Sequence, residues 1–311
     1  MWQPSTTTGV CLRSLHHAGV RDYEEVVKQL YDAGYRVLDF AFVLHNSAGY
    51  ILKEDDWQQR IDGVANLAAK LGVTFSQSHL PYVTDTQFNA DANFKKPGYM
   101  DYFKECMRRA YIGSGMLGVR YATLHPISCP EFNYEEEATM QANHEFFDEF
   151  IELGIKHHVG TAYENMLPVL DRKYPARYCT HYEQLIRLVD SYDDKMVGIC
   201  WDTGHANFMQ FDQERALLAM GHRVKNLHIN DNHNCNRDEH LQPFMGYINW
   251  ESILRGLAKI QYDGDLTYET NQVGIKAKDE LQDAFVRLTY ENGCYLRKLF
   301  DEERAKLEMN K

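Results

Sequence analysis

Carboxylate and histidine side chains recur at the ends of short apolar runs along this chain. Because strands of a parallel sheet are buried, a charged group at a strand's carboxyl end needs a chemical reason. The carboxyl ends of such strands meet at one face in a closed barrel, so we expect these side chains to converge. The six runs end in Ser78-His79-Leu80-Pro81, Leu124-His125-Pro126, Tyr163-Glu164-Asn165, Trp201-Asp202-Thr203-Gly204-His205, Leu227-His228-Ile229 and Tyr268-Glu269-Thr270.

The convergent set consists of carboxylates and imidazoles and contains no cysteine. This mixture suits zinc, manganese, cobalt or iron better than calcium, which prefers oxygen ligands. Without a cation, carboxylates this close would repel one another and some of their pKa values would rise. The sequence therefore predicts one divalent metal ion, with positions left open for a substrate. Its expected ligands are Glu164, Asp202, His228 and Glu269.

Each of these residues also has a structural interpretation when it is taken alone. His79 and His125 lie close to prolines and would serve as hydrogen-bonded structural histidines. Asp202 would cap a helix, and Glu164 would pair with a buried arginine. The chemical interpretation depends on six consecutive strands that end alike. The remaining histidines are interpreted as structural or exposed: His16, His17, His45, His144, His157, His158, His181, His222 and His233.

Strand-like runs alternate with segments of helical periodicity from one end of the chain to the other. In the first helical segment, the apolar Val26, Val27, Leu30 and Tyr31 recur on one face between charged residues. Parallel neighbours need a crossover helix, so this alternation predicts a (β/α)₈ barrel, read as one domain over residues 1–311. A doubly wound open sheet is the alternative, but no G-x-G-x-x-G motif follows the first strand.

The elements of this barrel can be placed along the sequence. Glycines at 34, 72 and 118 mark the ends of three helices, and the charged segment Asp301–Lys311 is expected to be a frayed helix end or a subunit contact of a homo-oligomer. The helices are expected near residues 22–33, 56–71, 99–116, 135–156, 180–192, 212–221, 250–261 and 277–300. The expected strands are Gly9–Leu15, Arg36–Phe42, Thr74–Leu80, Arg120–His125, Gly160–Asn165, Val197–Asp202, Val224–Ile229 and Asp265–Thr270.

The composition indicates which classes of partner and which cellular environment to expect. The chain has 311 residues with 33 Lys and Arg against 45 Asp and Glu, a formal net charge of −12. This balance disfavours a partner held mainly through phosphate neutralisation, so nucleic acid is not expected. The amino terminus lacks the features of a secretion signal, and no apolar run reaches the roughly 18 residues of a membrane helix. The seven cysteines are scattered without a C-x-x-C pair, so we expect a cytoplasmic protein.

The strand-end motifs resemble those of the xylose isomerase-like barrel superfamily, which includes ketose 3-epimerases, inosose isomerases and dehydratases, and endonuclease IV. The combination of Asp202-Thr203-Gly204-His205 with His228-Ile229-Asn230-Asp231-Asn232 is fairly specific for the superfamily but does not choose among its members. The strand count extends the resemblance to nearly the whole chain. Further matching motifs are Glu164-Asn165-Met166, Asp238-Glu239-His240-Leu241, Gly246-Tyr247-Ile248-Asn249-Trp250 and Tyr268-Glu269.

The resemblance to the epimerases implies an isomerase or epimerase that moves a proton next to a carbonyl of a sugar or polyol derivative. It implies the same four metal ligands, with Glu164 and Glu269 also serving as acid and base on opposite faces of the substrate. The chain departs from the epimerases at Leu170 and Asn234, where they place a glutamate and an arginine. Free-ketose 3-epimerisation is therefore not the specific expectation.

The same resemblance assigns roles to further polar residues. His205, and with it His79 and His125, would contact the oxygens of the substrate. Asp238 and His240 would add metal or substrate contacts. The chain has no glycine-rich phosphate cradle, which favours an unphosphorylated substrate. Six aromatic residues are candidates for a stacking wall or for the core: Trp2, Phe42, Tyr82, Trp201, Phe208 and Phe244.

The resemblance to endonuclease IV implies a different activity for this chain, the metal-assisted hydrolysis of a phosphodiester in abasic DNA. The net charge of −12 and the absence of arginine- or lysine-rich loops argue against it. A lyase or dehydratase acting on an oxidised sugar or glycoside, and a non-catalytic sugar-binding subunit, are further alternatives. Residue types compatible with all the zinc ligands of endonuclease IV occur in order: His79, His125, Glu164, Asp202, His205, His228, Asp238, His240 and Glu269.

Overall fold

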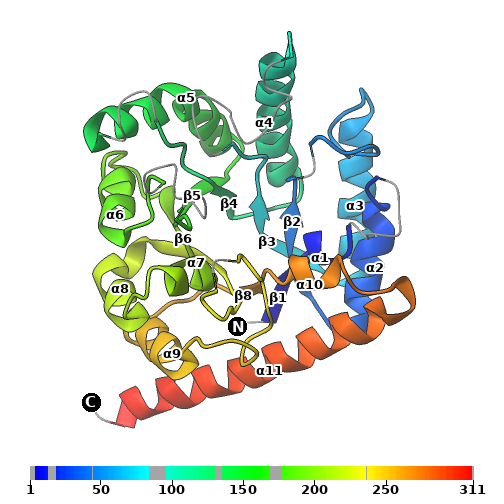
Figure 1. The fold of residues 1–311 in the computed structure, drawn as a ribbon. Helices are drawn as coiled ribbons and strands as arrows, with labels where there is room; N and C mark the ends of the chain where they lie inside the picture. The colour runs from blue at the N-terminus through cyan, green and yellow to red at the C-terminus, as the bar shows by residue number, and fades with distance from the viewer. Residues whose placement is uncertain are drawn as a thin grey trace.

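The computed structural model describes residues 4–12, 19–43, 45–83, 96–129, 135–168, 177–235 and 237–309. Within these ranges, eight parallel strands form one sheet in the order β7-β6-β5-β4-β3-β2-β1-β8, and helices surround it (Figure 1). This arrangement confirms the predicted (β/α)₈ barrel. The strands are β1 Pro4–Thr7, β2 Val37–Ala41, β3 Thr74–His79, β4 Tyr121–Leu124, β5 Gly160–Glu164, β6 Val197–Asp202, β7 Val224–His228 and β8 Leu266–Tyr268.

The sheet closes between β7 and β8 through the residue that follows His228. The amide of Ile229 donates to Thr267 O at 2.7 Å, and the amide of Glu269 donates to Ile229 O at 3.0 Å. Ile229 and Tyr268 thereby form a parallel bridge that joins the two ends of the sheet. This seam lies at the carboxyl end of the strands, next to two of the predicted metal ligands.

The helices follow the predicted pattern closely. In α2 the side chains of Val26, Val27 and Leu30 are fully buried, as their spacing requires. Gly72 follows α3 with φ 68°, a left-handed conformation that glycine adopts without steric cost. The helices are α1 Gly9–Leu12, α2 Tyr23–Ala33, α3 Trp57–Leu71, α4 Tyr99–Met116, α5 Glu136–Lys156, α6 Tyr182–Asp190, α7 Thr203–Phe208, α8 Gln213–Met220, α9 Trp250–Lys259, α10 Asn271–Gly274 and α11 Asp279–Met309, with a 3₁₀ turn at Gly221–Arg223.

The first strand lies earlier than predicted. The expected strand Gly9–Leu15 is wrong, because β1 precedes it and Gly9–Leu12 form the short helix α1. Residues 13–15 lie outside the described residues. The polar residues of β1 are buried, so apolar content did not mark the strand. Pro4 is tolerated because the first position of a strand can do without an amide donor.

The C-terminal helix α11 runs along the outside of the barrel past α2 and α9 (Figure 1). It was predicted to end near residue 300 in a frayed segment, but it continues to Met309. Pairs such as Arg297–Asp301, at 3.8 Å, join charges one turn apart on its surface. Despite its length, neither α11 nor any other helix within the described ranges has the apolar length needed to cross a membrane.

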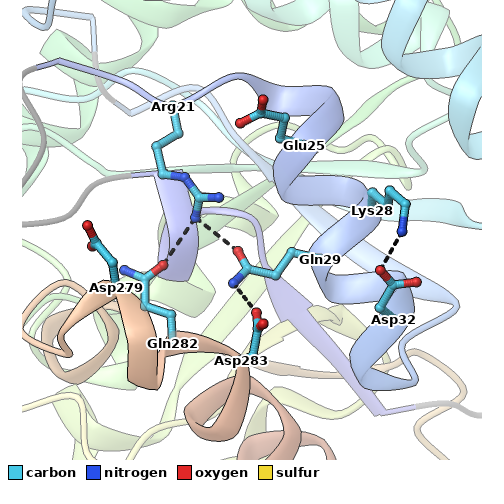
Figure 2. A pocket seen from close by; sticks show the side chains of 8 residues that line it. All are labelled: Arg21, Glu25, Lys28, Gln29, Asp32, Asp279, Gln282 and Asp283. Atoms are coloured by element: carbon cyan, nitrogen blue, oxygen red, sulfur yellow. Dashed lines mark hydrogen bonds and ion pairs between the residues drawn. The ribbon is translucent and has the colours of Figure 1, made fainter.

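Polar contacts join α11 to α2 around a cavity of about 440 Å³, shown in Figure 2. Arg21 Nη1 donates to Gln29 Oε1 at 2.9 Å and to Gln282 Oε1 at 3.1 Å. Gln29 Nε2 in turn donates to Asp283 Oδ1 at 2.6 Å. These bonds connect the last helix to the first long helix, so the cavity belongs to the outer helical layer rather than to the carboxyl ends of the strands.

An aromatic cluster around Phe40 packs β2 against the outer layer. Phe40 is fully buried, and the ring centroids of Tyr23, Phe42 and Phe75 lie 4.9, 4.7 and 5.4 Å from its own.

We predict that Phe40→Ala lowers the free energy of unfolding by about 3–5 kcal/mol, because the surrounding side chains cannot refill the cavity that it leaves. Urea denaturation measures this loss. The control Tyr247→Ala, at a side chain that is 75% exposed, should change stability by less than about 0.5 kcal/mol; similar losses in both variants would contradict the assignment.

Candidate metal centre

The structure brings all nine predicted polar residues to the carboxyl face of the barrel. His79, Glu164, Asp202 and His228 are the last residues of β3, β5, β6 and β7. His125 and Glu269 follow β4 and β8 by one residue, and His205 lies in α7. Asp238 and His240 lie in the connection between β7 and α9. The predicted convergence is therefore present. Leu170, where the resemblance implies a glutamate in the epimerases, lies outside the described residues.

Four residues form what we term the central group: Glu164, Asp202, His228 and Glu269. One donor atom from each lies within 4.8 Å of the others. His228 Nδ1 is 3.1 Å from Glu164 Oε1 and 3.4 Å from Glu269 Oε2. Both ring nitrogens of His228 are buried, and neither is aligned for a hydrogen bond to a described N or O atom, although Nδ1 lies beside two carboxylates. A buried imidazole beside three carboxylates fits a divalent cation.

Burial and mutual repulsion shape the ionisation of the central group. Burial, reinforced by the neighbouring Glu164 and Glu269 carboxylates, raises the pKa of Asp202 to about 6. Burial would also raise the pKa of Glu164, but His228 and His125 outweigh it and hold that pKa well below its usual range. The group therefore depends on nearby positive charge, which histidines supply in the absence of an ion.

Asparagines hold Asp202 in place. Asp202 Oδ1 accepts from the His205 amide at 2.6 Å, and Oδ2 accepts from Asn230 Nδ2 at 2.7 Å. Asn165 pairs with the Asp202 backbone through bonds of 2.6 and 3.0 Å. A Cβ atom at Gly204 would overlap the Asn230 side chain, which explains the glycine in the Asp-Thr-Gly-His motif. Asn165 and Asn230 belong to the sequence motifs, but this role depends on contacts between strands that the motifs do not specify.

A second set, the loop group, contains His205, Asp238 and His240. Their donor atoms also lie within 4.8 Å of one another. Asp238 Oδ2 is 2.8 Å from His240 Nε2 and 3.9 Å from His205 Nε2. Burial alone would lower the pKa of His205, but Asp202 and Asp238 raise it to about 10. The loop group is thus a second place where the site attracts positive charge.

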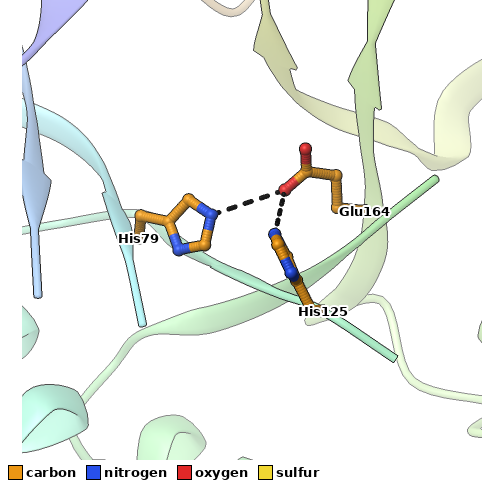
Figure 3. A group of neighbouring side chains, drawn as sticks. All are labelled: His79, His125 and Glu164. Carbon is orange, nitrogen blue, oxygen red and sulfur yellow. Dashed lines mark ion pairs between the residues drawn. The ribbon is translucent and has the colours of Figure 1, made fainter. Parts of the chain in front are cut away.

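A third set, the β3–β4 group, contains His79, His125 and Glu164 (Figure 3). Glu164 Oε2 lies 3.0 Å from His125 Nε2 and 3.5 Å from His79 Nε2. Burial lowers the pKa of His125, which favours the neutral form that can bind a metal. Glu164 belongs to both the central and the β3–β4 groups, so it connects them.

Backbone carbonyls fix the orientation of three histidines. The Nδ1 atoms of His79, His205 and His240 donate to the carbonyls of Leu80, Asn165 and Glu269 at 2.9, 2.8 and 2.7 Å. Each Nε2 is thereby left to face a carboxylate. This pattern is typical of metal-binding histidines, whose second nitrogen is held by a hydrogen bond that sets the tautomer.

The expectation that the convergent set contains no cysteine is wrong. Cys200 lies two residues before Asp202 in β6 and is fully buried. Its sulfur, with donor atoms of Glu164 and His228, forms a further set whose members lie within 4.8 Å of one another. The signal was present in the sequence, because residues two apart in a strand face the same side.

The aromatic residues proposed for a stacking wall lie partly in the core and partly at the surface. Phe42 and Trp201 are fully buried in the core, Phe208 is 9% exposed, and Trp2 lies outside the described residues. Tyr82 is 40% exposed, and its ring centroid lies 4.3 Å from that of His125. Phe244 is exposed and packs near Trp250. Tyr82 is therefore the aromatic candidate that contacts the site.

Asp231 anchors the connection that carries the loop group. Its Oδ1 accepts from the amides of Asn232 and Ile248 at 2.9 and 3.2 Å. Its Oδ2 accepts from the Phe244 amide at 3.1 Å and from Trp250 Nε1 at 3.0 Å. One buried carboxylate thus satisfies four donors that lie before and after Asp238 and His240. Asn234, where the resemblance to the epimerases implies an arginine, lies in this connection with φ 52°.

Comparison with known proteins agrees with this geometry. A sequence profile of the xylose isomerase-like TIM barrel family matches residues 27–288. The chain belongs to this family. It is 29% identical over 185 residues to an uncharacterized protein of Methanocaldococcus jannaschii, covering 58% of this chain and 61% of that protein. It is 30% identical over 124 residues to an uncharacterized protein of Sinorhizobium fredii, covering 40% of this chain and 37% of that protein. The matches thus span less than two thirds of these curated relatives.

Solved structures of similar fold cover almost the entire chain. A D-tagatose 3-epimerase-like protein superimposes with a TM-score of 0.71 at 21% identity, covering 98% of this chain and 99% of that one. An L-ribulose 3-epimerase gives 0.71 at 14% identity, with coverages of 99% and 98%. The IOLI protein with a bound zinc atom also gives 0.71 at 14% identity, with 98% of both chains covered. At these identities the likeness establishes the fold.

We predict that Asp231→Asn weakens the loop group selectively. An amide has one acceptor oxygen, so its nitrogen would face donors that now bond to Asp231. The expected loss of stability is about 1–3 kcal/mol for a donor left unsatisfied, with metal binding retained at the central group. Denaturation and metal analysis measure both. The control is Asp190→Asn, at an exposed carboxylate paired with Arg223, which should lower the free energy of unfolding by less than about 1 kcal/mol. An Asp231→Asn protein with unchanged stability would refute the anchoring role.

Proposed function

We propose that the protein is a divalent-metal-dependent isomerase or epimerase that acts on a sugar or polyol derivative by proton transfer next to a carbonyl. The observation that carries the proposal is the convergence of Glu164, Asp202, His228 and Glu269 at the mouth of the barrel. A bound divalent ion would polarise the substrate carbonyl and stabilise the negative charge that develops as the α-proton leaves. Zinc, manganese, cobalt and iron all suit this donor set.

Glu164 and Glu269 are the proposed proton-transfer residues. They approach His228 Nδ1 from two different strand ends, at 3.1 and 3.4 Å. A substrate carbon held between them would meet one carboxylate on each face, so that one removes a proton and the other returns it. His79 and His125 orient Glu164 from the other side, and the side chain of Glu269 is the more accessible of the two glutamates, at 13% against 1%.

The remaining residues of the mouth suit a small polyhydroxylated substrate. His205 and the loop group offer donors to hydroxyl oxygens. The exposed ring of Tyr82, tilted by 32° against the ring of His125, offers an apolar face for a sugar ring. The sugar epimerases among the structures of similar fold support this substrate class. The resemblance to the epimerases implies an arginine at the position of Asn234, so the proposed substrate is not restricted to a free ketose.

We predict that Glu164→Gln and Glu269→Gln each lower kcat by about 10²–10⁴-fold, the usual contribution of an acid or base. Turnover of a panel of ketoses, inososes and oxidised glycosides, followed by product analysis, measures the effect. Glu214→Gln is the matched control, since this glutamate lies on α8 and pairs with Arg255 and Lys259 away from the site. Near wild-type activity in either site variant would refute the two-carboxylate mechanism. Release of a leaving group instead of an isomer would assign lyase chemistry to the same residues.

A metal-dependent phosphodiesterase acting on abasic DNA is the second candidate. It is favoured by one specific observation, the loop and β3–β4 groups that lie beside the central group. Together the three groups offer donors for three ions, which could activate water and hold phosphate oxygens. The net charge of −12 opposes it, because a duplex would have to be bound without a strongly basic surface.

The number of bound ions separates the two candidates. Elemental analysis of gently purified protein should give about one ion per chain if only the central group is filled, as expected for the sugar enzyme. Three ions, one for each group, together with nicking of an abasic oligonucleotide, would favour the phosphodiesterase. Protein that binds no ion after metal-free dialysis and reloading would contradict both.

A further inference from the structure

A buried thiol lies one layer deeper in the barrel than the central group. Cys200 and Asp202 are two residues apart on β6, so both side chains face the same side of the sheet. Cys200 lies about 6.5 Å nearer the amino end of the strand. Cys200 is in register with Glu164 of β5 and with Asn226 of β7. Its sulfur lies within 4.8 Å of a Glu164 oxygen and a His228 nitrogen. We term Glu164, Cys200 and His228 the inner group.

The inner group is closed to solvent. Glu164 is 1% exposed, and Cys200 and His228 are 0% exposed. The ring of His228 is fully buried, and its Nδ1 lies 3.1 Å from Glu164 Oε1 without being aligned for a hydrogen bond to it. A buried imidazole beside a carboxylate is stabilised by a cation that both can bind. The imidazole, the thiol and the Glu164 carboxylate therefore form a buried set of donor atoms that suits an ion.

The charges of the two groups differ. Burial raises the pKa of the Cys200 thiol, so its thiolate would form only as an ion binds. That thiolate and one carboxylate would then neutralise a divalent ion in the inner group, which suits a dry environment. The three carboxylates of the central group would leave a net negative charge around the same ion. The donor atoms differ as well, because a thiolate prefers zinc, cadmium or cobalt, whereas a set of oxygens with one nitrogen also suits manganese and magnesium.

We propose that the inner group is a second coordination position, which takes a thiophilic divalent ion in place of the central position. Glu164 and His228 belong to both groups, so a single ion occupies one position or the other. On binding, the sulfur of Cys200 forms a bond to the ion and its proton passes to solvent. The proposal rests on the proposed function only in requiring that the centre binds a divalent ion. It makes Cys200 a determinant of metal choice.

Cobalt substitution tests the proposal directly. Co²⁺ is added to metal-free full-length protein, and the bound metal is quantified by elemental analysis. A sulfur-to-cobalt charge-transfer band in the near ultraviolet is expected in the wild type and in Cys106→Ala, a control at a buried cysteine of α4 that belongs to none of the donor groups. The band should be absent from Cys200→Ser and Cys200→Ala. Circular dichroism verifies the folding of both variants.

Competition with a chelator supplies a second readout. Cys200→Ser should weaken Zn²⁺ binding by at least about 10-fold, since altering even the partners of metal ligands costs about 10–100-fold, and should leave Mn²⁺ binding within about threefold. Bound cobalt without a charge-transfer band in the wild type, a band that persists in both Cys200 variants, or equal losses for Zn²⁺ and Mn²⁺ would overturn the inner position while leaving the central one intact. Failure of any ion to bind would instead overturn the metal dependence on which the proposed function rests.

Discussion

Three carboxylates held together in a largely dry barrel mouth are the constraint on which the rest of the site depends. Glu164 and Asp202 are buried, Glu269 is nearly so, and their mutual repulsion must be offset for the barrel to be stable. The histidines from β3, α7 and β7 supply part of that compensation, as the lowered pKa of Glu164 indicates. The raised pKa of Asp202 shows that the compensation is incomplete there. A metal ion would supply the remainder of the compensation. The same buried carboxylates that lower the stability of the barrel therefore give the site its affinity for a divalent ion.

The neutral residues around these charges limit how far each can move. Asn165 and Asn230 hold Asp202, and backbone carbonyls hold three histidine rings, so the donor atoms are oriented before any ligand arrives. Asp231 does the same for the loop group through four hydrogen bonds. Preorganisation of this kind lowers the entropic cost of binding an ion and a substrate.

Much of this arrangement could be predicted from sequence because a parallel barrel sends the ends of its strands to one face. Glu164, Asp202 and His228 ended recognisable strands, and the barrel made them neighbours. Apolar content does not predict β1, because its buried residues are polar. The pattern of strand ends does not include Cys200 among the donors, because it lies two residues before the end of β6. The Asp231 anchor depends on where distant amides of the loop return, which neither periodicity nor spacing specifies.

The seam between β7 and β8 has a mechanical consequence. It is made by Ile229, and the metal ligands His228 and Glu269 flank its two hydrogen bonds. An ion bound to both ligands would tie the last strand to its neighbour at the point where the parallel ladder is shortest, and so resist local opening of the wall. Release of the ion and fraying of the barrel would then be one event, which links the lifetime of the bound metal to the lifetime of the closed cylinder.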